Sequence, residues 1–333
     1  MNKYLLISIT VVIFIFINSC SPKKDYIKNE GYIFGTMYHF TYKSNKDLEP
    51  AIKKQLQKFN ESLSTYDPNS IISRINQNDT SVQTDKYFTT CFNKAYEIST
   101  VTNGAFDMTV APIVNAWGFG FDESAIADSI KIDSLMQYIG FDKVKLVKNK
   151  IIKETIGLML DASAIAKGYG VDVAVEVIEF AGIKNYMVEI GGEVRAKGIN
   201  EKGNLWQIGI DKPIEDPTAM HRELEAIVSL NDKSLATSGN YRQFYEKDGI
   251  KYSHTINPKT GYPAQNRLLS ASVLANNCMT ADAFATAFMV MGVEESIKLS
   301  DSLKNIEVYF IYTDSINSYK TYGSKGFEQI LVK

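Results

Sequence analysis

The 333-residue chain has few cysteines and no excess of charge of either sign. Its three cysteines are too few for a disulfide scaffold, and the odd number leaves one to be explained. The 36 basic residues nearly balance the 38 acidic ones, for a net charge of −2, which argues against a nucleic-acid binder. With 45% hydrophobic residues and ordinary glycine and proline counts, the chain is neither collagen-like nor disordered. What remains is a globular protein of one large or two ordinary domains.

The common nucleotide and hydrolase signatures are also absent. The sequence contains no P-loop, no GxGxxG, GxSxG or HExxH motif, and no cysteine pair at zinc spacing. The chemistry must therefore come from polar groups that such motifs do not mark.

The N-terminus has the layout of a signal peptide. The first nineteen residues carry one charged side chain, and the apolar run Leu5–Ile17 is shorter than the ~20 residues of a membrane-spanning helix. The run ends in INSC at Cys20, which resembles the bacterial lipobox, where the cysteine becomes lipid-modified. We expect residues 1–19 to be a signal peptide, Cys20 to carry acyl chains such as palmitate, and residues 20–30 to form a tether. The alternative is an ordinary secretory peptide with an incidental cysteine.

Hydrophobic periodicity predicts a mixed α/β body. Apolar residues at helical spacing predict an amphipathic helix from Leu48 to Leu63, and Cys91 lies on a second such stripe. Cys278 is expected at the end of a strand, and the sequence does not show whether these two cysteines pair. No regular βαβ order or internal repeat is present, which favours one mixed α/β body with a helical insertion over a doubly wound sheet. Strands are predicted at 33–42, 143–147, 186–190, 206–210 and 226–230.

The segment Asp161–Asp172 (DASAIAKGYGVD) is the first candidate site. It is rich in small residues and opens a predicted helix, whose unpaired N–H groups and positive dipole end suit an anion. Lys167 would add a full positive charge. The alternative is a helix that packs closely through its alanines and glycines.

The second candidate is Asp282 with Thr286, four residues apart on one face of a predicted helix 281–291. A carboxylate and a hydroxyl on one face can ligate a hard cation such as Mg²⁺. The alternative is an N-terminal capping arrangement with the aspartate in the first turn.

The third candidate is His254, at a predicted strand end before the turns of Asn257-Pro258 and Thr260-Gly261. A histidine beside a rigid loop is well placed to act as a general base, although a lone histidine can equally be structural. Tyr66 and Phe106 stand next to turns, where each ring could stack on a flat heterocycle or belong to the core.

Taken together and in this order, these segments resemble the ApbE family, bacterial lipoproteins that act as FAD:protein FMN transferases. The resemblance spans residues 31–333 and implies an α+β, T-fold-related single body with a helical insertion. The matching segments are GTMY at 35–38, STYD at 64–67, NGAFDMTVAP at 103–112, Asp161–Asp172, GGE at 191–193, SGNY at 238–241, His254–Gly261 and Ala281–Thr286.

The resemblance implies a role for individual positions. His254 occupies the family's histidine position, for which a base role is plausible, and Mg²⁺ is held by the Ala164 carbonyl with the side chains of Asp282 and Thr286. Two positions are looser matches: some members have an acidic residue where this chain has Lys167, and some have a second aspartate where it has Ala285. The FAD-binding positions fall on Met37, Tyr66, Ala105, Phe106, Asp107, Asp161, Lys167 and Ile256.

The implied reaction passes FMN from FAD to a threonine or serine hydroxyl of an acceptor protein, through a phosphoester bond, with release of AMP. Small residues such as Gly168 and Gly170 would then let the backbone approach the phosphates. The acceptors implied are subunits of membrane redox complexes or other exported flavoproteins. The protein itself would be exported and lipid-anchored, at an inner membrane facing the periplasm. Two alternatives stay open: a Mg²⁺-dependent FAD pyrophosphatase that gives FMN and AMP, and a non-catalytic FAD-binding lipoprotein.

Overall fold

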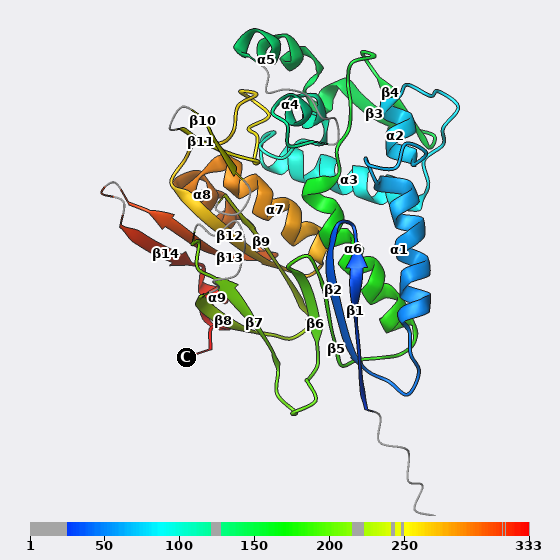
Figure 1. The fold of residues 1–333 in the computed structure, drawn as a ribbon. Coiled ribbons are helices and arrows are strands. Elements are labelled where there is room, and N and C mark those ends of the chain that lie inside the picture. Colours follow the sequence, from blue (N-terminus) through cyan, green and yellow to red (C-terminus); the bar gives the residue numbers. More distant parts are fainter. Residues whose placement is uncertain are drawn as a thin grey trace, which may run out of the picture.

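The chain folds around an eight-stranded sheet whose neighbouring strands all run antiparallel (Figure 1). The computed structural model describes residues 25–120, 128–214, 223–240, 244–247, 250–314, 316 and 318–332. The predicted signal peptide and Cys20 lie outside these residues. In spatial order the strands are β1 (Tyr26–Ile33), β2 (Thr36–Lys43), β5 (Tyr186–Ile190), β6 (Glu193–Lys197), β9 (Lys233–Gly239), β12 (Leu268–Ala275), β13 (Ile306–Thr313) and β14 (Tyr319–Gly323).

Helices and three small hairpins surround this sheet. The hairpins pair β3 (Val144–Val147) with β4 (Lys150–Lys153), β7 (Trp206–Asp211) with β8 (Leu224–Leu230), and β10 (Phe244–Lys247) with β11 (Ile250–Ser253). The helices are α1 (Glu49–Leu63), α2 (Ile71–Asn76), α3 (Lys86–Val101), α4 (Ala111–Ala116), α5 (Ser129–Leu135), α6 (Ser163–Phe180), α7 (Cys278–Met291), α8 (Val293–Ser302) and α9 (Lys325–Glu328), with 3-10 turns at 108–110, 136–138 and 141–143.

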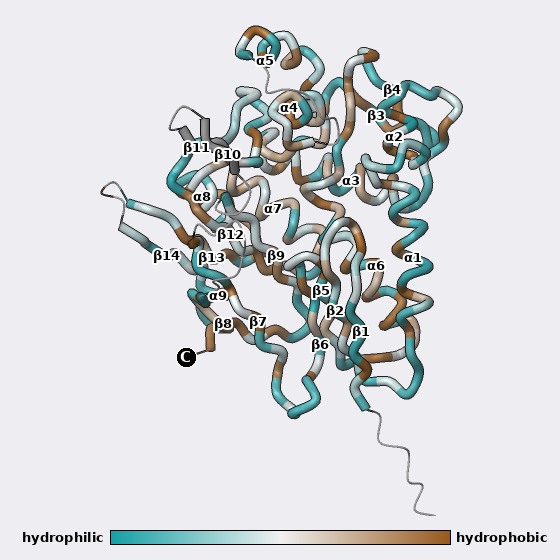
Figure 2. The backbone as a smooth tube through the Cα atoms, viewed as in Figure 1, coloured by the Kyte–Doolittle hydropathy of each residue, from teal (hydrophilic) through white to brown (hydrophobic). Residues whose placement is uncertain are grey.

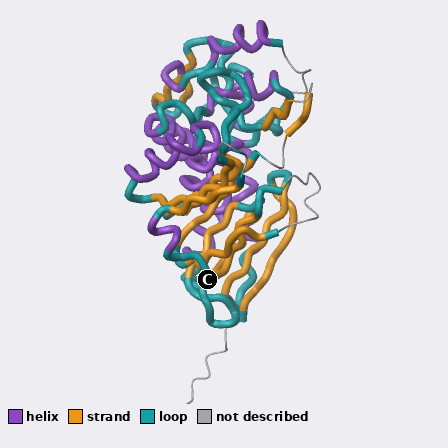
Figure 3. Tube along the Cα trace, turned by 90° about the vertical axis from the view of Figure 1, so that its left-hand side faces the viewer, coloured by secondary structure: helices purple, strands orange, loops and turns teal. Residues whose placement is uncertain are grey.

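The predicted fold class is confirmed. Strand β2 pairs directly with β5, although the chain between them forms α1 to α6 and the β3–β4 hairpin, so a largely helical segment is inserted between adjacent strands. Viewed from the side, most helices gather in one half of the molecule and most strands in the other (Figure 3). The amphipathic helix predicted from Leu48 is α1, whose buried residues include Ile52, Leu56 and Phe59.

Three predictions about local structure need correction. The strand expected at 33–42 is interrupted, because Phe34 and Gly35 adopt positive φ values of 52° and 73° and reverse the chain between β1 and β2. The expected tether ends earlier than residue 30, because β1 begins at Tyr26 and pairs along its length with β2. Cys278 does not end a strand: it is the first residue of α7, after the N-cap residue Asn277.

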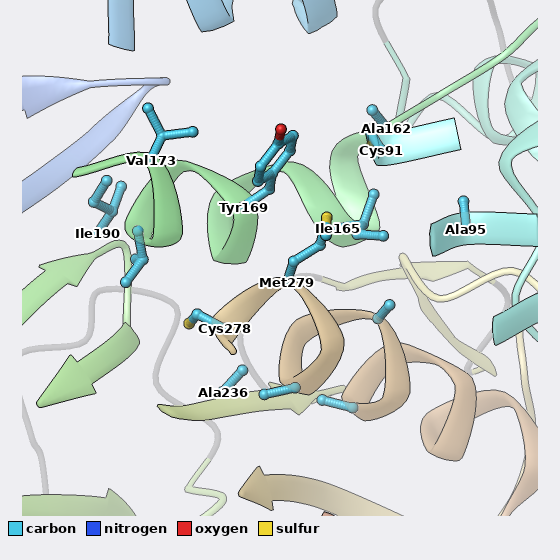
Figure 4. Packing of buried hydrophobic residues seen from close by; sticks show 14 of the residues in the cluster. Cys91, Ala95, Ala162, Ile165, Tyr169, Val173, Ile190, Ala236, Cys278 and Met279 are labelled. Carbon is cyan, nitrogen blue, oxygen red and sulfur yellow. The ribbon is translucent and has the colours of Figure 1, made fainter. Parts of the chain in front are cut away.

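The core lies mainly between the sheet and the pair α6 and α7, whose residues are largely hydrophobic (Figure 2). Figure 4 shows Ile165 and Tyr169 of α6 near Met279 of α7. The two helices approach closely at Gly168, where an added Cβ would lie 2.7 Å from Cβ of Asp282 and would also collide with the backbone oxygen of Cys278. This close contact positions the residues of the site described below.

Two smaller features complete the fold. Cys91 and Cys278 are both buried and both free thiols, so they do not pair. Within the described residues, no helix combines the length and the apolar character that crossing a bilayer requires. Helix α5 buries Ile132 alone.

Candidate functional site

The sequence-predicted residues meet at one cavity of about 460 Å³. Its walls come from the turns after α1 and α3, the first turns of α6, the β5–β6 turn, the end of β9, the loop after β11 and one face of α7. Eleven of the twelve residues assigned above line it: Tyr66, Ala105, Phe106, Asp107, Asp161, Ala164, Lys167, His254, Ile256, Asp282 and Thr286. Met37 is not among the lining residues. Its backbone oxygen accepts the N–H of Gly191 at 3.0 Å, and Gly191 does line the cavity.

The loop that carries His254 is held in a fixed shape by several hydrogen bonds. The Trp117 indole donates to the Gly261 carbonyl at 2.7 Å, and Ala264 N–H donates to the Thr255 carbonyl at 2.8 Å. His254 follows directly after β11 and lies edge-on to Phe119, with ring centroids 6.5 Å apart. The expectation of a histidine at a strand end beside a rigid loop is confirmed; a role as general base stays a prediction.

The aromatic side of the cavity combines one exposed ring with one buried ring. Tyr66 is 73% exposed, whereas Phe106 is only 3% exposed. Asp107 is fixed by Thr109, whose N–H and hydroxyl both donate to Oδ1 at 2.8 and 2.7 Å. Burial raises the pKa of Asp107, and the bonds from Thr109 partly oppose that shift. Of these two rings, it is Tyr66 that can offer a full face to a ligand that enters from solvent.

The start of α6 presents both an acidic and a basic group. Asp161 Oδ1 accepts the N–H and the hydroxyl of Ser163 at 2.8 and 2.5 Å. Burial raises the pKa of Asp161, whereas these two hydrogen bonds lower it. Lys167, one turn into the helix, makes a short bond to Oε1 of the buried Glu193. The positive charge of Lys167, which was expected to face an anion, is therefore paired with a carboxylate. This pairing was not predicted from the sequence.

The Asp282 carboxylate is buried, with a relative exposure of 3%, and it does not cap its own helix. Its Oδ2 accepts the N–H of Gly168 on α6 at 2.8 Å, and the N-cap of α7 is Asn277, so the capping alternative is wrong. Among the described residues, Thr286, one turn on, makes a single long contact of 3.3 Å to the Ser238 hydroxyl. Burial raises the pKa of Asp282, against Lys167 and the Gly168 N–H, which lower it.

These donors fit a hard divalent cation. A carboxylate, a hydroxyl and the Ala164 carbonyl, which lies one helical turn before Gly168, are all oxygen ligands of the kind that Mg²⁺ takes, and a cation would favour the charged form of Asp282. Within the described part of the chain, no cluster of three or more His, Cys, Asp or Glu side chains could hold a metal. The predicted set contains a single carboxylate, so it is not such a cluster.

Carboxylates outnumber basic groups around the cavity. Its described lining includes three carboxylates, Asp107, Asp161 and Asp282, but one lysine, and that lysine is paired with Glu193. A dinucleotide diphosphate would bring further negative charge into the same space. A bound dication would offset the negative charge of the carboxylates and would so favour the binding of a diphosphate.

Two glycines of α6 have a different role from the one expected. Gly168 packs against α7, and an added Cβ on Gly170 would lie 2.7 Å from the Phe34 ring. Both serve close packing, which was the alternative reading of this segment, and neither lines the cavity. Glu193 was not among the predicted site residues; its only signal in the sequence was the Gly191-Gly192-Glu193 segment of the resemblance.

Comparisons with known proteins give matches over most of the chain. The ApbE family model matches residues 34–310. FAD:protein FMN transferase of Vibrio cholerae is 36% identical over 94% of this chain and 95% of its own length, and that of Haemophilus influenzae is 35% identical over 99% of each.

Solved structures show the same likeness. The flavin transferase ApbE from Vibrio cholerae superimposes with a TM-score of 0.84 at 36% identity, covering 92% of this chain and all (100%) of that one. The apo flavinyl transferase ApbE of Pseudomonas stutzeri gives a TM-score of 0.80 at 27% identity, covering 92% of this chain and 97% of that one. The chain belongs to the ApbE family.

Proposed function

We propose that this protein is a flavin transferase that moves FMN from FAD onto a threonine or serine hydroxyl of an acceptor protein and releases AMP. The observation that carries the proposal is the convergence of eleven family positions, from segments far apart in the chain, on one cavity. Relatives at 35–36% identity over almost the whole chain bear the name FAD:protein FMN transferase.

The proposed reaction exchanges one phosphoester partner for another. The acceptor hydroxyl oxygen bonds to the phosphorus that carries the riboflavin chain, and the bond from that phosphorus to the bridging oxygen breaks. AMP leaves with the bridging oxygen and its electron pair, while His254 takes the hydroxyl proton. Bound Mg²⁺ would supply charge neutralisation at the diphosphate oxygens.

The chain's own residues would bind and orient FAD. The exposed Tyr66 ring offers a face for the isoalloxazine, the start of α6 directs N–H groups and a positive dipole end at the diphosphate, and Asp282, Thr286 and Ala164 would hold Mg²⁺. Phe106 and Ile256 are buried and line the cavity, so they would present apolar surface to the bound FAD.

We also propose that the protein is exported and anchored through acyl chains on Cys20, as the apolar run and INSC sequence indicate. The first strand begins at Tyr26, so even a fully extended chain from Cys20 would span roughly 20 Å, and the body would stay close to the bilayer. Metabolic labelling with palmitate and membrane fractionation test this proposal. A Cys20→Ser variant should be unlabelled and released; retention of that variant in the membrane would contradict it.

A single incubation tests the catalytic proposal. The purified full chain is mixed with FAD, Mg²⁺ and an exported flavoprotein subunit as acceptor, and the products are read by flavin fluorescence on a denaturing gel and by chromatography of AMP. Transfer predicts a fluorescent acceptor band and an equal amount of AMP. AMP with free FMN and no labelled acceptor would instead make the protein a pyrophosphatase, and no AMP at all would make it a binding protein.

Two variants and one control separate the roles. His254→Ala should abolish transfer while FAD still binds, and Asp282→Ala should abolish AMP release with FAD binding largely kept. His39→Ala is the matched control, because this histidine pairs with Glu189 on the exposed surface of the sheet and does not line the cavity. Unchanged turnover in His254→Ala would remove that residue from the mechanism.

A further inference from the structure

Glu193 is a buried carboxylate with a single described hydrogen-bond partner. Its relative exposure is 3%, Oε1 accepts the Lys167 ammonium, and Oε2 is buried with no partner among the described residues. Burying a carboxylate without satisfying both oxygens costs stability. An apolar residue would pack there at lower cost, so the carboxylate needs an explanation beyond packing.

Lys167 lies within the influence of two carboxylates. Its stem crosses the β5–β6 turn at Gly191, where an added Cβ would be 3.3 Å from Lys167 Cδ. Burial alone would lower the pKa of Lys167, but Glu193 and, more weakly, Asp282 raise it. The ammonium is hydrogen-bonded to Glu193, and Asp282 is its competing anionic neighbour.

We propose that Glu193 is a positioning residue that holds the Lys167 ammonium away from Asp282 and so keeps that carboxylate available to a divalent cation. The inference rests on the proposed function, since it assigns Mg²⁺ to Asp282. A lysine ammonium on a flexible four-carbon stem is itself a cation, and it competes with Mg²⁺ for the same oxygen atoms. Without the charge on Glu193, Asp282 becomes the remaining anionic partner of Lys167.

A simple field effect makes a different prediction. Removing any nearby negative charge weakens cation binding, whether or not a lysine moves. In that case Glu193→Gln weakens Mg²⁺ binding by the same factor in the presence and in the absence of Lys167. If Lys167 is captured by Asp282 instead, the loss requires the lysine and vanishes with it.

The experiment is a double-mutant cycle on Mg²⁺ affinity. Mg²⁺ is titrated calorimetrically into the full chain in the presence of ADP, a diphosphate with no flavin to transfer. Glu193→Gln should weaken Mg²⁺ by about 10–100-fold, as for other residues that support metal ligands, whereas Glu193→Gln in a Lys167→Gln background should have an effect below about threefold. Glu189→Gln, on the same hairpin and paired with His39, is the matched control and should stay within about twofold of wild type.

Each outcome decides the question. Equal weakening by Glu193→Gln in both backgrounds, or equal weakening by Glu189→Gln, overturns the inference in favour of a field effect. If Glu193→Gln does not fold by circular dichroism, Lys167→Gln alone is informative, because the inference requires Mg²⁺ to bind it at least as tightly as wild type. Failure of the wild type to bind Mg²⁺ would defeat the metal part of the proposed function, whereas normal wild-type binding with no effect of Glu193→Gln defeats this inference alone.

Discussion

The contact between α6 and α7 at Gly168 gives the sharpest test of how packing positions the site. A Cβ at this position would meet backbone of α7, the carbonyl of Cys278, and Cβ of Asp282 at 2.7 Å. Backbone atoms cannot rotate away, so Gly168→Ala must push the two helices apart. The same movement would break the bond from the Gly168 N–H to Asp282 and displace the predicted metal ligand.

The expected size of the effect follows from two opposing contributions. Alanine is favoured over glycine inside a helix by about 1 kcal/mol, whereas overpacking a core costs about 1–3 kcal/mol and the lost hydrogen bond to a buried carboxylate about 1.5–3 kcal/mol. Gly168→Ala should therefore lower the free energy of unfolding by about 1.5–5 kcal/mol. It should also weaken Mg²⁺ binding at Asp282.

Gly170→Ala is the matched control on the same helix. Its Cβ would meet Cε2 of the Phe34 ring, also at 2.7 Å, but a side chain can move, so the expected loss is at most about 1 kcal/mol with Mg²⁺ affinity unchanged. Urea denaturation gives the stability of both variants and calorimetry their Mg²⁺ affinity. If Gly168→Ala matched Gly170→Ala in both measurements, the helix contact would not position the site.

Three further predictions concern single side chains. Burial raises the pKa of Asp172 from 3.8 to about 6, so the folded state holds this proton more tightly and stability falls by about 2 kcal/mol as pH rises from 4 to 7. The difference in unfolding free energy between Asp172→Asn and wild type should shift by that amount in favour of the variant, whereas parallel pH profiles would contradict the prediction. Thr286→Val should weaken Mg²⁺ binding yet change the melting temperature little, because the contact of the Thr286 hydroxyl within the described part of the chain is the 3.3 Å one to Ser238; a large loss of stability would point to a structural role. Trp117→Phe should lower the free energy of unfolding in urea by about 1–3 kcal/mol because it removes the indole donor to the Gly261 carbonyl. It should also reduce transfer by loosening the loop that carries His254. Unchanged turnover would show that this loop keeps its shape without the indole.

The elements that the sequence predicts well are those whose pattern is local. The helix α1 follows from its apolar spacing, and β5 at Tyr186–Ile190 matches the predicted strand residue for residue. The reversal at Phe34 and Gly35 was missed because it requires a phenylalanine at φ 52°, which no propensity favours. The pairing of β2 with β5 is a long-range contact that local periodicity does not encode.

The site was predictable in its positions but not in its contacts. The order of short segments identified eleven cavity residues. A glycine in the first turns of a helix suits either a bound phosphate or a closely packed helix, and only the contact of Gly168 with α7 decides between them. Glu193 escaped notice for a similar reason, since its importance comes from its burial and from a lysine 26 residues away.

The junction of α6 and α7 joins the stability of the core to the chemistry of the cavity. Asp172, Glu193 and Asp282 all lie there, and burial raises the pKa of each, so the charged form of each costs stability in the folded state. For Asp172 this cost is partly offset, because its carboxylate accepts the first two N–H groups of α7 at 2.8 Å each. Glu193 and Asp282 share mainly Lys167, one positive charge between two negative ones. An arrangement that leaves negative charge uncompensated beside a cavity is most readily explained if a cation completes it, and this connects the proposed magnesium site to the energetics of the fold.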